Sequence, residues 1–126
     1  MMGPGMMGNV IRHRYVRANG LPPEYRSARN PLAPNAENIG KGAQLYATNC
    51  ASCHGPEGYG DGPAAAQLNP PPANLARTVR LPIATDPFFY WTIEEGGKPV
   101  GSVMPAFKEI LKPEQVWEII LYLRQL

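Results

Sequence analysis

Proline and glycine constrain the fold of this chain more than any other feature of its sequence. The chain has 15 prolines and 13 glycines among 126 residues, roughly twice the share in an average protein. Both residues disfavour the interior of a helix, because proline lacks a backbone donor and glycine carries a high entropic cost. The sequence therefore excludes a coiled coil or a bundle of long helices. It predicts short helices connected by loops, around an interior that side chains alone do not fill.

Helical patterns mark three stretches of the chain. Residues 36–49 follow Asn35, a favourable N-cap, and place Gly42 inside a helix, where glycine costs about 1 kcal/mol. A second helix is expected to start at Asp86, as its cap, and to stop at a pair of glycines. A last helix runs from Pro113 almost to the end of the chain, with an apolar stripe. No stretch alternates between apolar and polar residues as a strand does, so we expect an all-α fold.

Charge divides the chain into two parts. Residues 1–35 hold five arginines and one glutamate, and are rich in Gly, Pro and Met without periodicity. We expect them to form an irregular basic arm or linker, either a solvated tail or a docking arm for an acidic partner. Residues 36–126 have a net charge of −2 and are expected to form the organised domain. This acidic body, without a recognition motif, argues against a nucleic-acid partner.

The most informative segment is Cys-Ala-Ser-Cys-His at residues 50–54. A redox dithiol is one interpretation, but that motif usually follows a strand. A zinc site is a second, but the only other histidine is His13 and there is no third cysteine. A plain disulfide is a third, and it leaves His54 unexplained. Covalent haem attachment accounts for the whole motif: Cys50 and Cys53 form thioethers with the haem vinyl groups, and His54 falls beneath the ring, where it can bind iron.

A single methionine is the candidate for a second axial ligand. Iron in an electron-transfer haem usually takes such a ligand from the opposite face of the ring. Outside the first 35 residues the chain has one methionine, Met104, fifty residues after His54. It lies between Gly101 and Pro105, in an irregular loop that suits a ligand better than a core residue. We therefore predict that His54 and Met104 bind the iron.

With these features the chain resembles a class I mono-haem cytochrome c of the small bacterial type. The resemblance covers residues 36–126. It implies a cytochrome c fold, with short helices and loops wrapped around one covalently bound haem. The N-terminal arm has no counterpart in the minimal family, and Lys112 stands where a Ser, Thr or Asp cap is usual. The resemblance rests on the motif at 50–54, Gly62-Pro63-Ala64, Met104-Pro105-Ala106-Phe107, and a closing helix with Trp117 and Tyr122.

The resemblance also implies contacts around the haem. The first and last helices of the family cross with a glycine against an aromatic ring, which implies Gly42 and Tyr122. A backbone carbonyl accepts the other ring N–H of the ligating histidine, which implies Pro63, with Pro71 and Pro72 as alternatives. Candidate pocket walls are Leu68, Leu75, Leu81, Trp91, Ile93 and Phe107, and candidate partners of the haem propionates are Tyr59, Arg77 and Arg80.

The expected function is electron transfer through a His/Met-ligated c-type haem between larger redox partner proteins, not catalysis. The alternatives are a haem enzyme or gas sensor with a labile sixth ligand, and a docked cytochrome subunit of a respiratory complex. A monomer or a docked subunit is expected, without a transmembrane span, because no stretch approaches the ~18 apolar residues that a span requires. The resemblance implies the periplasm, although the first ten residues do not have the pattern of a signal peptide.

Overall fold

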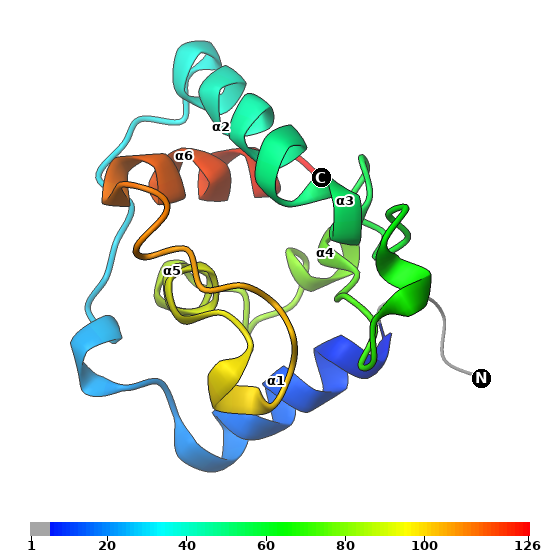
Figure 1. The fold of residues 1–126 in the computed structure, drawn as a ribbon. Coiled ribbons are helices and arrows are strands. Elements are labelled where there is room, and N and C mark those ends of the chain that lie inside the picture. Colours follow the sequence, from blue (N-terminus) through cyan, green and yellow to red (C-terminus); the bar gives the residue numbers. More distant parts are fainter. Residues whose placement is uncertain (1–5) are drawn as a thin grey trace.

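The computed structural model describes residues 6–126 and is helical (Figure 1). Within that range there is no strand, so the all-α prediction is confirmed. Three of the longer helices form the frame of the domain, and another long helix lies near the N-terminus. The elements are α1 (Met6–Asn19), α2 (Ala36–Asn49), α3 (Ala51–His54), α4 (Leu75–Thr78), α5 (Asp86–Glu95), α6 (Pro113–Leu123) and the 3₁₀ turns η1 (Pro23–Tyr25), η2 (Ala65–Gln67) and η3 (Lys98–Val100).

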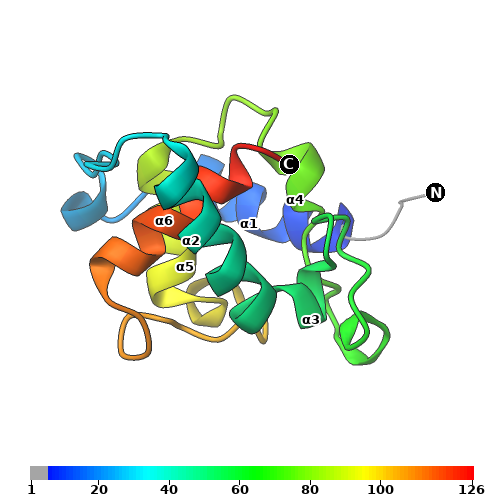
Figure 2. The same ribbon diagram turned by 90° about the horizontal axis from the view of Figure 1, so that it is seen from above.

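Helix α2 has the predicted bounds, and it crosses α6 in direct contact (Figure 2). The side chain of Asn35 accepts a hydrogen bond of 2.9 Å from the backbone N–H of Asn38, as the cap prediction requires. At the crossing, a Cβ atom on Gly42 would lie 2.0 Å from the backbone oxygen of Glu118 and 3.1 Å from Cβ of Tyr122. The glycine is therefore needed for the close approach of the two helices, as expected for Gly42 and Tyr122.

The starts of α5 and α6 differ in detail from the sequence prediction. The cap of α5 is Thr85, whose hydroxyl accepts a hydrogen bond of 3.2 Å from the N–H of Phe88, and Asp86 is the first helical residue. Asp86 instead forms an ion pair of 2.8 Å with Arg124 just beyond α6. At the start of α6 the backbone N–H of Lys112 donates to the side chain of Gln115 at 2.9 Å, so the glutamine supplies its half of a capping box although no Ser, Thr or Asp stands at the cap.

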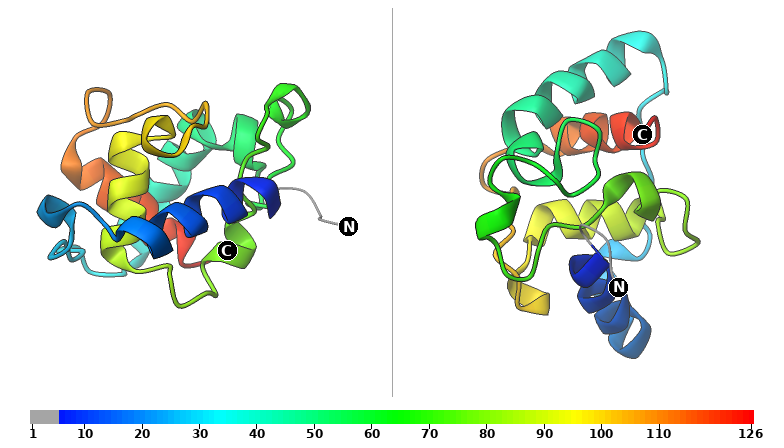
Figure 3. Two further views of the ribbon diagram at one scale, coloured as in Figure 1. Left: turned by 90° about the horizontal axis from the view of Figure 1, so that it is seen from below. Right: turned by 90° about the vertical axis from the view of Figure 1, so that its right-hand side faces the viewer.

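The prediction of an irregular arm is wrong for residues 6–19, which form α1. This helix packs against α5 on the lower side of the molecule (Figure 3). Its Arg12 and His13 are each only 8% exposed, and the His13 ring meets Phe88 edge-on at 5.9 Å. Tyr15 stacks on Trp91, also at 5.9 Å. The packed face of α1 thus contains a buried arginine and a buried histidine beside the partly buried Val16, which is why no clear apolar periodicity marks it.

The segment between α1 and α2 is also attached to the domain. The hydroxyl of Tyr25 donates a hydrogen bond to Glu95 at the end of α5. The backbone N–H of Asn30 donates to Asp86 at 2.9 Å, and its side-chain amide donates to the carbonyl of Trp117 at 3.1 Å. Residues 20–35 therefore run along the helical frame. The division of the chain between residues 35 and 36 stays a prediction.

The apolar core lies where α2, α5 and α6 meet. Its fully buried members include Tyr46 from α2, Phe89 from α5 and Ile120 from α6. Tyr46 is 2% exposed, and its hydroxyl donates a hydrogen bond of 2.6 Å to the carbonyl of Gly55, just after α3. The core thereby fixes the end of the short helix that carries the cysteine motif. None of the helices in residues 6–126 is both long enough and apolar enough to cross a membrane.

Candidate functional site

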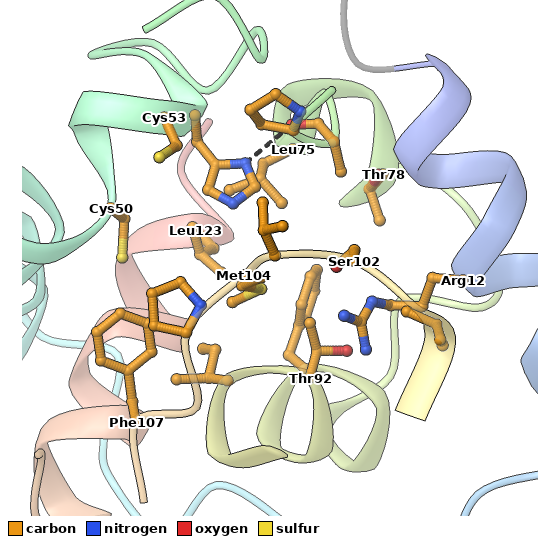
Figure 4. Close-up of a pocket in the computed structure, with 18 of the residues that line it drawn as sticks. Arg12, Cys50, Cys53, Leu75, Thr78, Thr92, Ser102, Met104, Phe107 and Leu123 are labelled. Carbon is orange, nitrogen blue, oxygen red and sulfur yellow. Dashed lines mark hydrogen bonds between the residues drawn. The ribbon is translucent and has the colours of Figure 1, made fainter. Parts of the chain in front are cut away.

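A cavity of about 270 Å³ opens beside α3, between α5 and the loop that carries Met104 (Figure 4). Segments from both halves of the chain line it, including α1, and most of the lining side chains are apolar. Four of the six predicted wall residues line it, and Leu81 and Trp91 do not. The lining residues are Ile11, Arg12, His13, Tyr46, Asn49, Cys50, Ser52, Cys53, His54, Leu68, Pro70, Pro71, Pro72, Ala73, Leu75, Thr78, Phe88, Phe89, Thr92, Ile93, Val100, Ser102, Val103, Met104, Pro105, Phe107, Ile119 and Leu123.

The two cysteines of the motif lie at one side of this cavity as free thiols. Cys50 ends α2 and precedes α3, and Cys53 lies within α3, so one helical turn brings both side chains to the cavity. Burial raises the pKa of the Cys50 thiol to about 12, with a smaller contribution from Cys53. A neutral, half-buried thiol of this kind is a weak nucleophile. Cys50 therefore does not have the character of the activated thiolate of a redox dithiol.

The imidazole of His54 is oriented by the backbone. Its Nδ1 lies 2.9 Å from the carbonyl oxygen of Ala73, which can only accept, so Nδ1 carries the proton of the neutral ring. Burial lowers the pKa of His54, and the nearby charge of Arg12 lowers it further, against the opposing effect of the Ala73 hydrogen bond. The neutral ring therefore keeps its lone pair on Nε2. A histidine held this way is suited to bind a metal ion through Nε2.

The carbonyl that orients His54 corrects a prediction from the sequence. Ala73 takes the role expected for Pro63, and it directly follows the alternatives Pro71 and Pro72. Pro63 is exposed and does not line the cavity. Its neighbours support α3 instead: the N–H of Gly62 donates to the carbonyl of Cys53 at 3.1 Å. The Gly-Pro-Ala segment thus supports α3 through a backbone hydrogen bond.

We expect Gly62→Ala to destabilise the protein by about 2 kcal/mol, through overpacking. A Cβ atom at this position would lie 2.3 Å from the carbonyl oxygen of Ser52, and no side-chain rotation relieves a backbone clash. The matched change Pro63→Ala removes an exposed ring and is expected to lower the free energy of unfolding by less than about 1 kcal/mol. Urea unfolding of the two variants measures the difference. Equal destabilisation would show that Pro63 has a structural role that its exposure hides.

The loop of Met104 is fixed by glycines at the end of α5. The N–H of Gly97 donates to the carbonyl of Met104, and the N–H of Ser102 donates to the carbonyl of Gly97, both at 2.9 Å. A Cβ atom on Gly96 would lie 2.5 Å from the carbonyl oxygen of Pro105, so the approach is close. These bonds place Met104, a half-buried residue, at the cavity from the segment opposite α3 (Figure 4).

Two polar groups at the cavity were not anticipated by the sequence analysis. Among the side chains that the structure describes, those of residues 11–126, the buried nitrogen and oxygen atoms without a hydrogen-bond partner are Nη1 of Arg12 and Oγ1 of Thr92, and both residues line the cavity. None of the predicted propionate partners lines it. Tyr59, Arg77 and Arg80 are exposed, and Arg80 donates to the carbonyl of Ala76. Arg12 escaped prediction because it was assigned to an irregular arm.

The described residues do not support a zinc site of the usual kind. Over residues 6–126, no group of three or more His, Cys, Asp or Glu side chains gathers as a metal cluster. His13, His54, Cys50 and Cys53 all line the cavity, but no three of them gather closely enough to form such a cluster. Apart from His13, the donors at the cavity are two thiols, the neutral imidazole of His54 and one thioether, in apolar surroundings.

The chain is similar to known proteins in sequence and in fold. The family model for cytochrome c matches residues 39–126. A chain of the reducing HAO-like protein complex of Kuenenia stuttgartiensis has a TM-score of 0.59 and 25% identity, over 75% of this chain and 46% of that one. This chain thus spans about half the length of that protein. Cytochrome CL of the marine bacterium Methylophaga aminisulfidivorans shares the fold, with a TM-score of 0.54 and 20% identity, over 98% of this chain and 72% of that one. No curated protein matches the sequence.

Proposed function

Because the chain belongs to the cytochrome c family, we propose that it carries one electron at a time between larger redox partners. Members of this family bind a covalent c-type haem, and Cys50 and Cys53 have the spacing of the attachment motif, with His54 following. Electron transfer by a haem protein is therefore the function that the family supports. The finer proposal is that His54 and Met104 are the two axial ligands.

One observation carries this proposal: the residues of the donor set reach one cavity from segments fifty residues apart. Cys50, Cys53 and His54 come from the α2–α3 junction, and Met104 comes from the loop after α5. The loops that bring them there are held by backbone hydrogen bonds and close glycine contacts. A methionine whose only role was to fill the core would not need a loop fixed at both ends.

The residues at the cavity fit a c-type haem in their chemistry. Two free thiols on one side suit thioether bonds to vinyl groups, and the apolar walls suit a porphyrin ring. Two buried polar groups without partners, on Arg12 and Thr92, suit the carboxylates that the same molecule carries. When bound, the iron cycles between ferrous and ferric states and so supplies the one-electron step.

The protein's own contribution is to hold the surroundings of the iron constant in both redox states. The Ala73 carbonyl fixes the tautomer and direction of the His54 ring. The paired hydrogen bonds between Gly97 and the Met104 loop limit movement of the thioether. Apolar side chains line most of the cavity, and in such surroundings little solvent has to reorganise when the charge changes. We propose that six-coordination leaves no position for a substrate, so the protein acts as a carrier.

A docked subunit is the second candidate, and it concerns assembly rather than chemistry. The neighbour with 25% identity belongs to an HAO-like protein complex, and this chain spans 46% of it. A domain of this kind inside a larger haem assembly would pass electrons without diffusing. A haem enzyme or gas sensor remains the third candidate, and requires that the sixth ligand leaves the iron.

We further propose a periplasmic location and redox proteins with an acidic surface as partners. The location follows from covalent haem attachment, which bacteria usually carry out on the periplasmic side of the membrane. The partner chemistry follows from Arg14, Arg17, Arg26 and Arg29, which are exposed on the N-terminal segment. Charges of one sign raise the rate of encounter with an oppositely charged protein.

Mass and optical measurements on the purified protein test the proposed function. We expect the intact mass, after acid–acetone extraction, to exceed that of the polypeptide by one haem, because thioether bonds survive extraction. The Cys50→Ala, Cys53→Ala double variant should lose its haem under the same treatment. We also expect the ferrous protein to bind carbon monoxide slowly or not at all. A mass equal to the bare chain would contradict haem attachment, and rapid carbon monoxide binding would favour the enzyme or sensor.

A further inference from the structure

Helix α1 contributes a buried arginine to the cavity, although it lies outside the segment that matches the cytochrome c family. The family match covers residues 39–126, whereas Arg12 belongs to Met6–Asn19. Figure 4 shows Arg12 on the side of the cavity far from Cys50 and Cys53. The wall opposite the cysteines is thus built partly by a helix that the family domain does not include.

The guanidinium of Arg12 is held in place but is not fully satisfied. Its Nη2 donates a hydrogen bond of 2.9 Å to the carbonyl of Gly96, and its carbon lies 5.1 Å from the centre of the Trp91 ring. Nη1 is buried and has no partner. The ion pairs formed by the described residues do not include Arg12. Burial accordingly lowers the pKa of Arg12 to about 10.

A second unsatisfied group lines the same cavity as this arginine. The hydroxyl of Thr92, on α5, is buried without a partner. In Figure 4 the hydroxyl of Thr92 and the guanidinium of Arg12 point into the same part of the cavity. A buried cation and a buried donor each cost free energy unless an acceptor meets them. Together they define a site for an anionic oxygen ligand, of the carboxylate class.

The c-type haem of the proposed function carries such carboxylates on the appropriate edge. Its two propionates lie on the edge of the ring opposite the two vinyl groups, and the vinyl groups are the ones that bind the cysteines. We therefore infer that Arg12, assisted by Thr92, binds a haem propionate. This inference rests on the proposed function and deepens it, because α1 becomes part of the haem site instead of a separate arm.

Such a contact has an electrostatic consequence for the iron. A buried cation beside the carboxylate keeps it ionised and offsets its negative charge, which otherwise stabilises ferric iron. Without Arg12 the carboxylate is desolvated and lacks its counter-charge, so it takes up a proton more readily. Protonation removes a negative charge near the iron and raises the reduction potential. The loss of Arg12 should therefore make the potential fall as the pH rises.

The test is the reduction potential of the holoprotein, measured between about pH 5 and 9. We expect the reduction potential of the wild type to be nearly independent of pH over the lower part of this range. Arg12→Gln should show a new ionisation, with the carboxylate pKa raised by about 1 to 3 pH units. Arg12→Lys keeps the charge and should restore most of the wild-type profile. The control is Arg14→Gln, the same change at an exposed position of α1. Its reduction potential should depend on pH as that of the wild type does.

Other groups near Arg12 must be separated from the propionate. The charge of Arg12 acts on two titratable groups, His13 on α1 and His54 on α3, and the charge of Arg17 also acts on His13. His54 is the proposed iron ligand, so His13 is the group to remove. The new ionisation should persist in the Arg12→Gln, His13→Gln double variant. Its disappearance there would assign the ionisation to His13 and overturn the inference.

Folding and haem binding are checked independently of this result. Arg12→Met keeps an unbranched stem over Trp91, so it serves if the glutamine variant does not fold. All variants should keep the covalent haem and the spectrum of the wild type, since Arg12 is not an axial ligand. If Arg12→Gln and Arg12→Met have the same pH profile as Arg14→Gln, Arg12 only packs on α5. The inference then fails while the proposed function stands.

Discussion

Replacing Met104 with alanine is expected to lower the reduction potential by on the order of 100 mV, because axial ligands control haem potentials over a wide range. A thioether favours ferrous iron, so its loss stabilises the ferric state. The weak sulfur-to-iron absorption band in the far red should disappear from the oxidised protein. The ferrous variant should also bind carbon monoxide, which the wild type is expected to resist. Redox titration followed by optical spectroscopy measures all three effects.

Two further variants define what the Met104 result means. Met104→His should also lower the potential, but it should keep six-coordination and resist carbon monoxide. Ile110→Ala changes a residue further along the same loop, which is 62% exposed and does not line the cavity, and it should leave the far-red band unchanged. If the band is absent from the wild type, or survives in Met104→Ala, the sixth ligand is another group. The enzyme or sensor interpretation would then replace the simple carrier.

The sequence predicts the parts of this molecule that depend on local patterns. The N-cap Asn35 and residues that recur at helical spacing predict a helix over 36–49, and α2 has those bounds. The glycine inside it was expected to permit close contact, and Gly42 lies against the backbone of Glu118. The cysteine motif and Met104 were expected to share one site, and both line one cavity. Each of these predictions needs only short-range spacing or a residue type that is rare in the chain.

The parts that the sequence did not predict depend on contacts between distant segments. Helix α1 was missed because its packed face carries Arg12 and His13, so its buried side looks polar in sequence. The acceptor of His54 was missed because backbone carbonyls carry no residue signature, and Ala73 accepts at 2.9 Å where Pro63 was expected. Every residue offers a carbonyl, and only the path of the chain decides which one reaches the ring.

Gly42→Ala is expected to destabilise the protein more than any other single methyl addition considered above. The new Cβ atom would lie 2.0 Å from the carbonyl oxygen of Glu118, closer than any non-bonded contact allows. The backbone of α2 fixes the position of the Cβ atom, and the oxygen belongs to the backbone of α6. No side-chain rotation can therefore relieve the clash, so α2 and α6 must separate and the core between them loosens. We expect a loss of about 3 kcal/mol in the free energy of unfolding, or roughly 10 °C in the melting temperature.

Gly40→Ala provides the matched control, because it makes the same change on the same helix. A Cβ atom on Gly40 meets nothing within 4 Å, so the only effect is the better helix propensity of alanine. This variant should be more stable than the wild type by up to about 1 kcal/mol. Changes of opposite sign in the free energy of unfolding, at two positions on one helix, distinguish the effect of the crossing contact from that of helix propensity. If Gly42→Ala also stabilises the protein, α2 and α6 do not approach as closely as Gly42 requires, and the haem cavity beside them must be built differently.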